Sequence, residues 1–304
     1  MPLPPLTDPE DIRTRLIALA KAAPASSLLF SALLGFNAAQ TFSTGLIPFS
    51  PRSFRAFNRW AADTWWGWCV SVAQRMNDAR LVITGDDVPM RENAIVVLNH
   101  QNMPDITFLM DFARQKGRLG DMKWIVKDPI KYFPGVGWGM LFIDCVFVKR
   151  DWAADRDSIR RTFAKLCDND IPVWLISFSE GTRITPEKLA RSRRYAEEHD
   201  LYVPRHVQVP RTKGFVATVE GLRDHVDAVY DLTLGYEQGV PTLWQFIKGY
   251  APRAHLHVRR YGIDTIPRED EEVSTWLLDR FREKDELLEH YYNSGMFPEG
   301  RGAG

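Results

Sequence analysis

The sequence predicts an α/β fold, with a mixed, largely parallel sheet flanked by helices and an N-terminal apolar helical segment. Two features of the 304-residue chain lead to this prediction. Short apolar runs of strand length alternate with stretches whose apolar residues recur at helical spacing. An uncharged segment from Ala22 to Pro51 precedes them. We therefore expect a helical, membrane-associating segment at residues 1–75 and an α/β domain at residues 76–304.

The expected strands are short and rich in apolar or β-branched residues. They are Ala94–Leu98, Met122–Lys127, Val146–Lys149, Val173–Ser177, Val207–Val209, Ala228–Leu234 and His255–Arg259. Two of the intervening helices have a clear apolar face. These faces consist of Ile159, Phe163 and Leu166, and of Val273, Trp276, Leu277, Phe281 and Leu288.

The uncharged N-terminal segment is long enough to cross a bilayer. If the stretch between Pro24 and Pro48 is helical, it is roughly 35 Å long, although polar residues dilute its second half. Three arginines follow before any acidic residue and would bind phospholipid head groups: Arg52, Arg55 and Arg59. We expect one span or a half-buried helix, and a buried helix of a soluble protein is the alternative.

The charge and cysteine content exclude several function classes. Basic and acidic residues each number 39, so the formal net charge is +0 and nothing global attracts nucleic acid. The three cysteines are too widely spaced for a disulfide framework or a zinc site: Cys69, Cys145 and Cys167. We therefore expect no nucleic-acid partner, no bound metal and a reducing compartment.

A histidine and an aspartate stand at a predicted strand-to-helix junction. His100 follows the apolar run Ala94–Leu98, and Asp105 follows Pro104, which suits the first turn of a helix. Such a pair can be a general base and the carboxylate that orients it. On spacing alone, a histidine held by a local carboxylate at a helix start is the favoured interpretation.

Cations follow three of the expected strands and shift the interpretation of His100 and Asp105 toward a catalytic role. Ser179-Glu180-Gly181-Thr182-Arg183 comes after one strand, Lys149 and Arg150 end another, and Lys213 follows a third. Ligands of open α/β sheets bind at the carboxyl ends of strands, and guanidinium groups suit phosphate. The pattern therefore predicts a phosphate-bearing substrate, although each segment alone could be a solvated loop.

These four segments resemble, in the same order, the four motifs of the glycerolipid acyltransferases. His100 to Asp105 is similar to their His-x4-Asp motif, and residues 178–183 are similar to their Glu-Gly-Thr-Arg motif. Residues 146–150 and 209–215 resemble the second and the proline motifs. The resemblance extends from about Gly35 to Phe297 and is strongest to 1-acylglycerol-3-phosphate (lysophosphatidate) acyltransferases of the eukaryotic gamma/delta type. One departure is Ser179, where the family commonly has proline or cysteine.

The resemblance implies transfer of an acyl group from acyl-CoA or acyl carrier protein to a lysophospholipid hydroxyl. His100 would be the general base, and Asp105 would orient its ring. The resemblance also implies a substrate-binding set that shapes the acceptor site and holds its phosphate. This set consists of Glu180, Gly181, Thr182, Arg183, Lys149, Arg150, Lys213 and, more weakly, Lys127. The thioester would be a co-substrate, and no cofactor is implied.

The same resemblance leaves the acceptor open. The expected product is phosphatidic acid in phospholipid synthesis. Alternatives are an acceptor with a larger head group, glycerol 3-phosphate as acceptor, or a membrane-binding relative without catalysis. A metal hydrolase is disfavoured because no second histidine has ligand spacing from His100. We expect a membrane-associated enzyme on a lipid surface, with its active site facing the cytoplasm, at a bacterial inner membrane or the endoplasmic reticulum.

Overall fold

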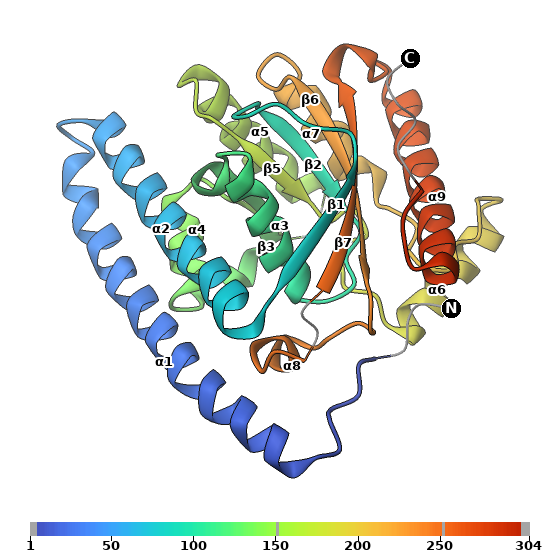
Figure 1. Cartoon of the computed structure of the whole chain (residues 1–304). Coiled ribbons are helices and arrows are strands. Elements are labelled where there is room, and N and C mark those ends of the chain that lie inside the picture. The colour runs from blue at the N-terminus through green and yellow to red at the C-terminus, as the bar shows by residue number, and fades with distance from the viewer. Residues whose placement is uncertain (1–4, 150–151, 251–252, 299–304) are drawn as a thin grey trace.

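The computed structural model describes residues 5–149, 152–250 and 253–298. Within these residues, seven strands form one sheet in the order β1-β7-β6-β2-β5-β3-β4 (Figure 1). The strands are β1 (Arg80–Gly85), β2 (Ala94–Leu98), β3 (Met122–Lys127), β4 (Val146–Val148), β5 (Trp174–Ser177), β6 (Ala228–Tyr236) and β7 (Arg253–Gly262). The helices are α1 (Ile12–Ser43), α2 (Pro51–Asn77), α3 (Pro104–Gln115), α4 (Val136–Phe142), α5 (Trp152–Asp168), α6 (Pro186–Glu198), α7 (Thr212–Leu222), α8 (Leu243–Ile247) and α9 (Asp270–Ser294).

The sheet is mixed and mostly parallel, which confirms the predicted fold class. Five strands pair in parallel with one another, in the order β6-β2-β5-β3-β4. Strand β7 pairs antiparallel with β6 and parallel with β1. The edge strand β1 was not predicted from the sequence. Because the parallel strands share one direction, the loops after β2 and β5 meet at the same edge of the sheet.

One predicted strand, Val207–Val209, is wrong. Its main-chain N–H groups donate to side chains from outside the sheet instead of to a neighbouring strand. Val207 N donates to Asp285 at 3.2 Å, Gln208 N to Glu180 at 3.0 Å and Val209 N to Ser192 Oγ at 2.8 Å. The segment is therefore an ordered loop whose backbone donors are satisfied without strand pairing.

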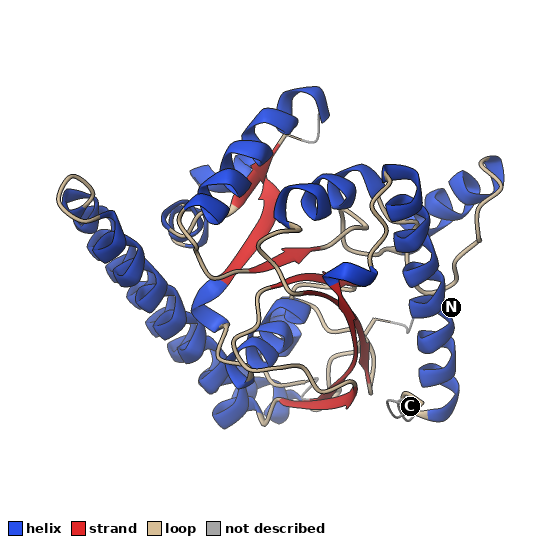
Figure 2. Ribbon diagram, turned by 90° about the horizontal axis from the view of Figure 1, so that it is seen from above, coloured by secondary structure: helices blue, strands red, loops and turns tan. Residues whose placement is uncertain are grey.

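Helices cover both faces of the sheet, as Figure 2 shows. The buried β2 alternates its side chains: Val96 and Leu98 join a core with α2, α3 and α8, and Ile95 and Val97 join a core with α5, α7 and α9. The expected helical faces on α5 and α9 belong to the second core. These two cores hold the strand ends in fixed positions.

Helices α1 and α2 form a long hairpin along one side of the molecule (Figure 1). Helix α1 begins after Asp11, whose carboxylate accepts the N–H groups of Arg13 and Thr14, and it continues through Pro24. Helix α2 lies partly within the sheet domain, because its apolar side chains enter the first core.

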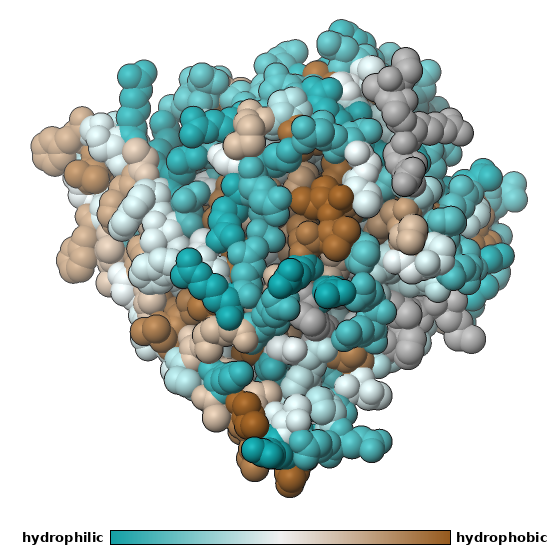
Figure 3. All heavy atoms as spheres, in the orientation of Figure 1, coloured by the Kyte–Doolittle hydropathy of each residue, from teal (hydrophilic) through white to brown (hydrophobic). Residues whose placement is uncertain are grey.

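Helix α1 exposes much of its apolar surface. The helical stretch Ile12–Leu46 is long and apolar enough to cross a membrane, and only 17% of its most apolar window is buried. Figure 3 shows hydrophobic residues gathered at the turn between α1 and α2. At this turn, Phe42 is 83% exposed and Phe49 is 88% exposed. Such a contiguous apolar surface is typical of a face that contacts lipid or protein.

Candidate active site

The predicted catalytic pair lies where β2 ends and α3 begins. His100 Nδ1 and Asp105 Oδ2 are 2.9 Å apart. Asp105 is fully buried in the first turn of α3, where the helix dipole favours a carboxylate. The His100 side chain is 11% exposed and lines a large cavity. Because Nδ1 contacts the carboxylate, Nε2 is the ring nitrogen left to act on a substrate.

Three further donors fix the Asp105 carboxylate. Oδ2 accepts the main-chain N–H groups of Gln101 at 2.7 Å and Asn102 at 2.9 Å, and Oδ1 accepts the Tyr236 hydroxyl at 2.6 Å. Burial, together with the neighbouring Asp105, raises the pKa of Tyr236 well above its usual value, so this hydroxyl keeps its proton and donates. A carboxylate held on both oxygens defines the direction of the imidazole ring.

The histidine ring is also fixed by packing. It stacks on Phe178, with ring centroids 3.9 Å apart and an interplanar angle of 22°. Asn99 exchanges two hydrogen bonds with the main chain of Leu234, and Gln101 Nε2 donates to the Leu234 carbonyl at 2.6 Å. The loop after β2 is therefore tied to the overhanging end of β6, and His100 has little freedom to move.

Glu180 supports the main chain of His100. Oε1 accepts the His100 N–H at 2.7 Å, and Oε2 accepts the N–H and the Nε2 group of Gln208 at 3.0 and 3.1 Å. Burial raises the pKa of Glu180 to about 7, although these three donors act in the opposite direction. All three of these hydrogen bonds come from protein donors, so the geometry of the carboxylate suits positioning of the loop that carries His100.

Main-chain hydrogen bonds join the predicted motifs to one another. Ile184 N donates to the His100 carbonyl at 2.9 Å, and Arg211 N donates to the Ser179 carbonyl at 2.8 Å. Gly181 lies between these contacts with a φ of +70°, and an added Cβ would stand 3.1 Å from Arg211 Nε. The tight turn at residue 181 therefore favours glycine.

Cationic side chains line the cavity around His100. Arg183 donates to Asn102 Oδ1 at 3.4 Å, and Lys188 donates to Thr182 Oγ1 at 2.7 Å. The predicted residues Gly181, Thr182, Lys127 and Lys213 also line this cavity, together with Arg191 and Arg211. Cations that line the same cavity as this histidine suit an acceptor that carries a phosphate.

Two of the predicted cations are placed differently or fall outside the described chain. Lys149 is exposed and does not line the cavity, whereas the preceding Val148 does. The Lys149 N–H donates to Asp155 at 2.7 Å. Arg150 lies outside the described residues. The predicted contribution of this strand end to phosphate binding therefore stays a prediction.

The same cavity continues into an apolar region between the helices. Its volume is about 1630 Å³. Apolar side chains from the helical hairpin and the β3–α4 region form its wall, and they include Leu29, Phe30, Leu33, Trp65, Trp66, Ile130, Val136 and Met140. The cavity therefore combines a cationic end at His100 with an apolar end that could accept a hydrocarbon chain.

No nucleophile pairs with His100 among the described residues. The Ser179 hydroxyl is 3.0 Å from Ser177 Oγ, and no hydrogen bond joins either serine to the histidine ring. Burial raises the pKa of Cys69, which lines the cavity, to about 12, so its thiol stays protonated. Within the described part of the chain, no group of three or more His, Cys, Asp and Glu side chains is arranged to hold a metal ion.

Comparison with known proteins identifies the family. Residues 80–236, just over half of the chain, match the family model described as Acyltransferase, and residues 245–303 match Acyltransferase C-terminus. The 1-acyl-sn-glycerol-3-phosphate acyltransferase 2 of Arabidopsis thaliana is 33% identical over 291 residues, which cover 93% of this chain and 74% of that protein. The chain belongs to the glycerolipid acyltransferase family. The predicted family resemblance is therefore confirmed.

Two other relatives are named for different acceptors. The 1-acyl-sn-glycerol-3-phosphate acyltransferase delta of Mus musculus is 38% identical over 210 residues, covering 69% of this chain and 56% of that protein. The lysocardiolipin acyltransferase 1 of Gallus gallus is 34% identical over 258 residues, covering 82% of this chain and 68% of that protein. The matched regions thus span between 56% and 74% of these three relatives.

A solved structure supports the fold of this acyltransferase. The 1-acyl-sn-glycerophosphate (LPA) acyltransferase PlsC from Thermotoga maritima aligns with a TM-score of 0.54 at 17% identity. The alignment covers 90% of this chain and 97% of that one. At this level of identity the comparison supports the arrangement of sheet and helices, not the choice of substrate.

Sequence reasoning missed several residues that complete the site of this acyltransferase. Tyr236 donates to Asp105, and Gln208 donates to Glu180, each from a distant part of the chain. Arg191, on α6, adds a cation to the cavity. Tyr236 ends β6, two residues beyond the expected strand 228–234, and the pairing of β6 with β2 brings it to the loop that carries His100.

Proposed function

We propose that this acyltransferase moves a fatty acyl group from acyl-CoA or acyl carrier protein to the free hydroxyl of 1-acylglycerol 3-phosphate, giving phosphatidic acid. The observation that carries the proposal is the position of His100. Its Nε2 borders a single cavity whose cationic end suits a phosphate and whose apolar end suits an acyl chain. The names of the plant and mouse relatives support the same acceptor.

The reaction needs only one proton shuttle. His100 Nε2 removes the proton from the acceptor hydroxyl as its oxygen attacks the thioester carbonyl carbon. Asp105 stabilises the resulting imidazolium through Nδ1. The C–O bond forms, the C–S bond breaks, and the imidazolium returns the proton to the leaving thiolate. No covalent acyl-enzyme is required, because the hydroxyl of the acceptor is itself the nucleophile.

The cations around His100 would hold the acceptor phosphate. Arg183 is the main candidate, because its guanidinium contacts Asn102 in the same loop as the base. Lys213 and Arg211 reach the same cavity from the start of α7. Binding the phosphate at this end places the glycerol hydroxyl toward Nε2 and directs the acyl chain along the apolar wall.

Replacing His100 with alanine tests the proposal directly. We expect kcat to fall by ~10²–10⁴ or more, because the general base is lost, while the thermal unfolding temperature stays close to that of the wild type. The assay follows acyl transfer from acyl-CoA to lysophosphatidate in vesicles. A folded His100→Ala variant with full activity would refute the assignment of the base.

A second candidate function differs only in the acceptor. The lysocardiolipin acyltransferase relative favours a lysophospholipid with a larger head group as the alternative. The wild type should be assayed side by side with lysophosphatidate, lysocardiolipin, lysophosphatidylglycerol and glycerol 3-phosphate. A higher kcat/KM for any acceptor other than lysophosphatidate would replace the first proposal with remodelling or with a different synthetic step.

Membrane attachment follows from the same proposal, because both acceptor and product are lipids. Helix α1 would lie in or cross the bilayer through its exposed apolar surface. The arginines at the start of α2 would then stand at the cytoplasmic head groups. Flotation of the full chain with vesicles, and protease accessibility in intact cells, test attachment and orientation separately.

A further inference from the structure

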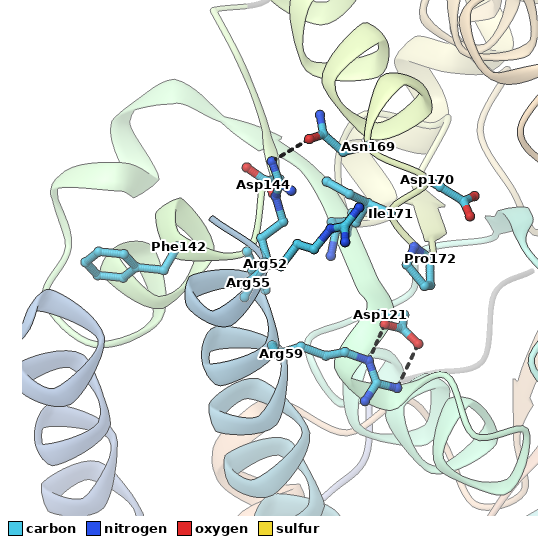
Figure 4. Close-up of a pocket in the computed structure, with 13 residues that line it drawn as sticks. Arg52, Arg55, Arg59, Asp121, Phe142, Asp144, Asn169, Asp170, Ile171 and Pro172 are labelled. Carbon is cyan, nitrogen blue, oxygen red and sulfur yellow. Dashed lines mark hydrogen bonds and ion pairs between the residues drawn. The ribbon is translucent and has the colours of Figure 1, made fainter. Parts of the chain in front are cut away.

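A second cationic hollow lies on the edge of the sheet opposite to His100. It has a volume of about 280 Å³ and is formed by the start of α2, the start of β3, residues 142–144 and the loop 169–172 before β5. His100, in contrast, follows the carboxyl end of β2, which runs parallel to β5. The hollow therefore borders the amino ends of these strands and is separate from the catalytic cavity. Figure 4 shows its lining.

Arginines of α2 point into this hollow (Figure 4). Arg55 donates to Asn169 Oδ1 at 2.9 Å, and Arg59 makes two hydrogen bonds to Asp121 at 2.6 and 2.9 Å. Arg52 makes no hydrogen bond or ion pair within residues 5–149, 152–250 and 253–298. One guanidinium is thus neutralised, one contacts a neutral amide, and one is available to an anion.

A buried lysine supplies the second and independent observation. Lys123 is 4% exposed and lines the hollow, and its ammonium group has no hydrogen-bond or ion-pair partner in the described part of the chain. Burial lowers its pKa, because the charged form loses its hydration, although Cys145, Asp121 and Asp144 act in the opposite direction. An unpaired ammonium at the wall of a hollow marks a place where an anion would be stabilised.

The carboxylates of the hollow do not cancel these cations. Asp121 is shared by Arg59 and Arg118, and Asp144 pairs with Lys165 from outside the lining. Asp170 is the remaining acidic residue that lines the hollow. Once the paired groups are set aside, positive charge remains in excess.

The exposed apolar turn beside the hollow indicates which kind of molecule would carry the anion. Phe49 and Phe42, both highly exposed, lie at the α1–α2 turn just before Arg52. The helical rise from Arg52 to Arg59 is roughly 10 Å. The hollow therefore starts at the depth of the lipid head groups when the apolar turn enters the bilayer. A volume of 280 Å³ is below that of usual drug-sized sites, roughly 300–1,000 Å³, and suits a head group without its chains.

We propose that this hollow is a non-catalytic site for a phosphate monoester, presented by the head group of an anionic membrane lipid. The apolar turn enters the acyl-chain region while Arg52, Arg55 and Lys123 surround the phosphate. A monoester carries more charge and more free oxygens than a phosphodiester, so it makes more contacts with converging cations. The site would hold the enzyme on membrane regions rich in such lipids, independently of the acceptor bound beside His100.

The test compares the full chain on two kinds of phosphatidylcholine vesicle. One kind contains phosphatidate, and the other contains phosphatidylglycerol, a diester, at matched surface charge. We expect the wild type to bind the phosphatidate vesicles on the order of tenfold more tightly. Arg52→Gln/Arg55→Gln should lose most of this preference. The control Arg75→Gln/Arg80→Gln removes two charges near the other end of α2 and should keep the preference.

Lys123→Met separates recognition in the hollow from surface attraction. It leaves the exposed charge unchanged, because Lys123 is buried, and it should also remove most of the preference. The two arginine substitutions lie at the surface, so they keep the test valid if Lys123→Met fails to fold. Phosphatidate also enters the catalytic cavity under the proposed function, but these variants leave that cavity intact.

Two results would overturn the proposal. A wild type that binds both vesicles equally refutes the lipid source. A preference that stays undiminished in both Arg52→Gln/Arg55→Gln and Lys123→Met refutes the hollow as the site. Titration with glycerol 3-phosphate forms the soluble arm. If it binds the wild type but not the variants while the vesicles show no preference, a soluble phosphate monoester replaces the lipid as the ligand.

Discussion

Replacing Glu180 with glutamine tests the role of this buried carboxylate as the support of the catalytic loop. The carboxylate accepts three N–H donors, one from His100 and two from Gln208. A glutamine side chain offers one oxygen and one NH2 group, so at least one buried donor loses its acceptor. An unsatisfied buried donor costs ~1–3 kcal/mol. Because the affected donor can be the His100 N–H, acyl transfer should also fall.

The pH dependence of the free energy of unfolding tests the role of Glu180 more sharply than the loss of activity does. The pKa of Glu180 is raised from 4.5 to about 7 in the folded chain, mainly by burial. Between these values the folded state keeps a proton that the unfolded state releases. Its contribution to stability is therefore complete below the lower pKa and is lost as the pH rises toward the upper one. At about 1.4 kcal/mol per pH unit, the whole change is on the order of 3 kcal/mol.

Urea unfolding of the wild type and Glu180→Gln in detergent, from about pH 5 to about pH 8, measures this contribution. The stability difference, wild type minus variant, should fall with rising pH by up to ~1.4 kcal/mol per unit and level off above about pH 7. Glu187→Gln, at an exposed carboxylate, controls for the loss of one acidic side chain. A difference that is constant, or that grows with pH, would refute the reasoning.

Three further substitutions test other contacts. Tyr236→Phe removes the hydroxyl that holds Asp105, and we expect kcat to fall on the order of tenfold with KM unchanged, measured by acyl transfer. Arg183→Gln should raise the KM for lysophosphatidate on the order of tenfold or more with little change in kcat. Lys284→Met leaves Asp231 buried without its partner, and it should lower the free energy of unfolding by ~3–5 kcal/mol in urea titrations.

Each of these variants has a matched control. Tyr230→Phe also removes a buried tyrosine hydroxyl, but one that contacts Glu92, so it should leave kcat unchanged. Arg193→Gln removes an exposed cation of α6 and should not alter KM. The pair Lys284→Met with Asp231→Leu should recover most of the lost stability. Equal effects of each variant and its control would contradict the assigned contacts.

Strands with a marked apolar run could be predicted from the sequence, and the exposed edge strand β1 could not. Strands β2 and β3 have the predicted bounds, and β2 is an apolar run covered on both faces. Strand β1 lies at the sheet edge with many exposed side chains, so its composition gives little signal. The segment 207–209 has strand composition, but side-chain acceptors on other elements take its N–H groups.

For the candidate site, the sequence predicts residues near one another in the chain and misses partners that depend on strand register. His100 and Asp105 are five residues apart and meet through one loop. Tyr236 reaches Asp105 only because Leu98 pairs with Leu232, so β6 extends beyond the end of β2 and over that loop. No local pattern encodes that overhang, because it depends on how far two distant strands slide past each other.

The last described helix, α9, has a consequence for how the protein matures. Asp285, buried on this helix, accepts the main-chain N–H groups of Arg205, His206 and Val207. The next residue along that loop donates to the glutamate that supports His100. During synthesis, His100 is therefore made early, but its loop gains full support only when α9 docks. A chain still on the ribosome would contain His100 and Asp105, yet the loop around them would lack part of its hydrogen-bond network until α9 is in place.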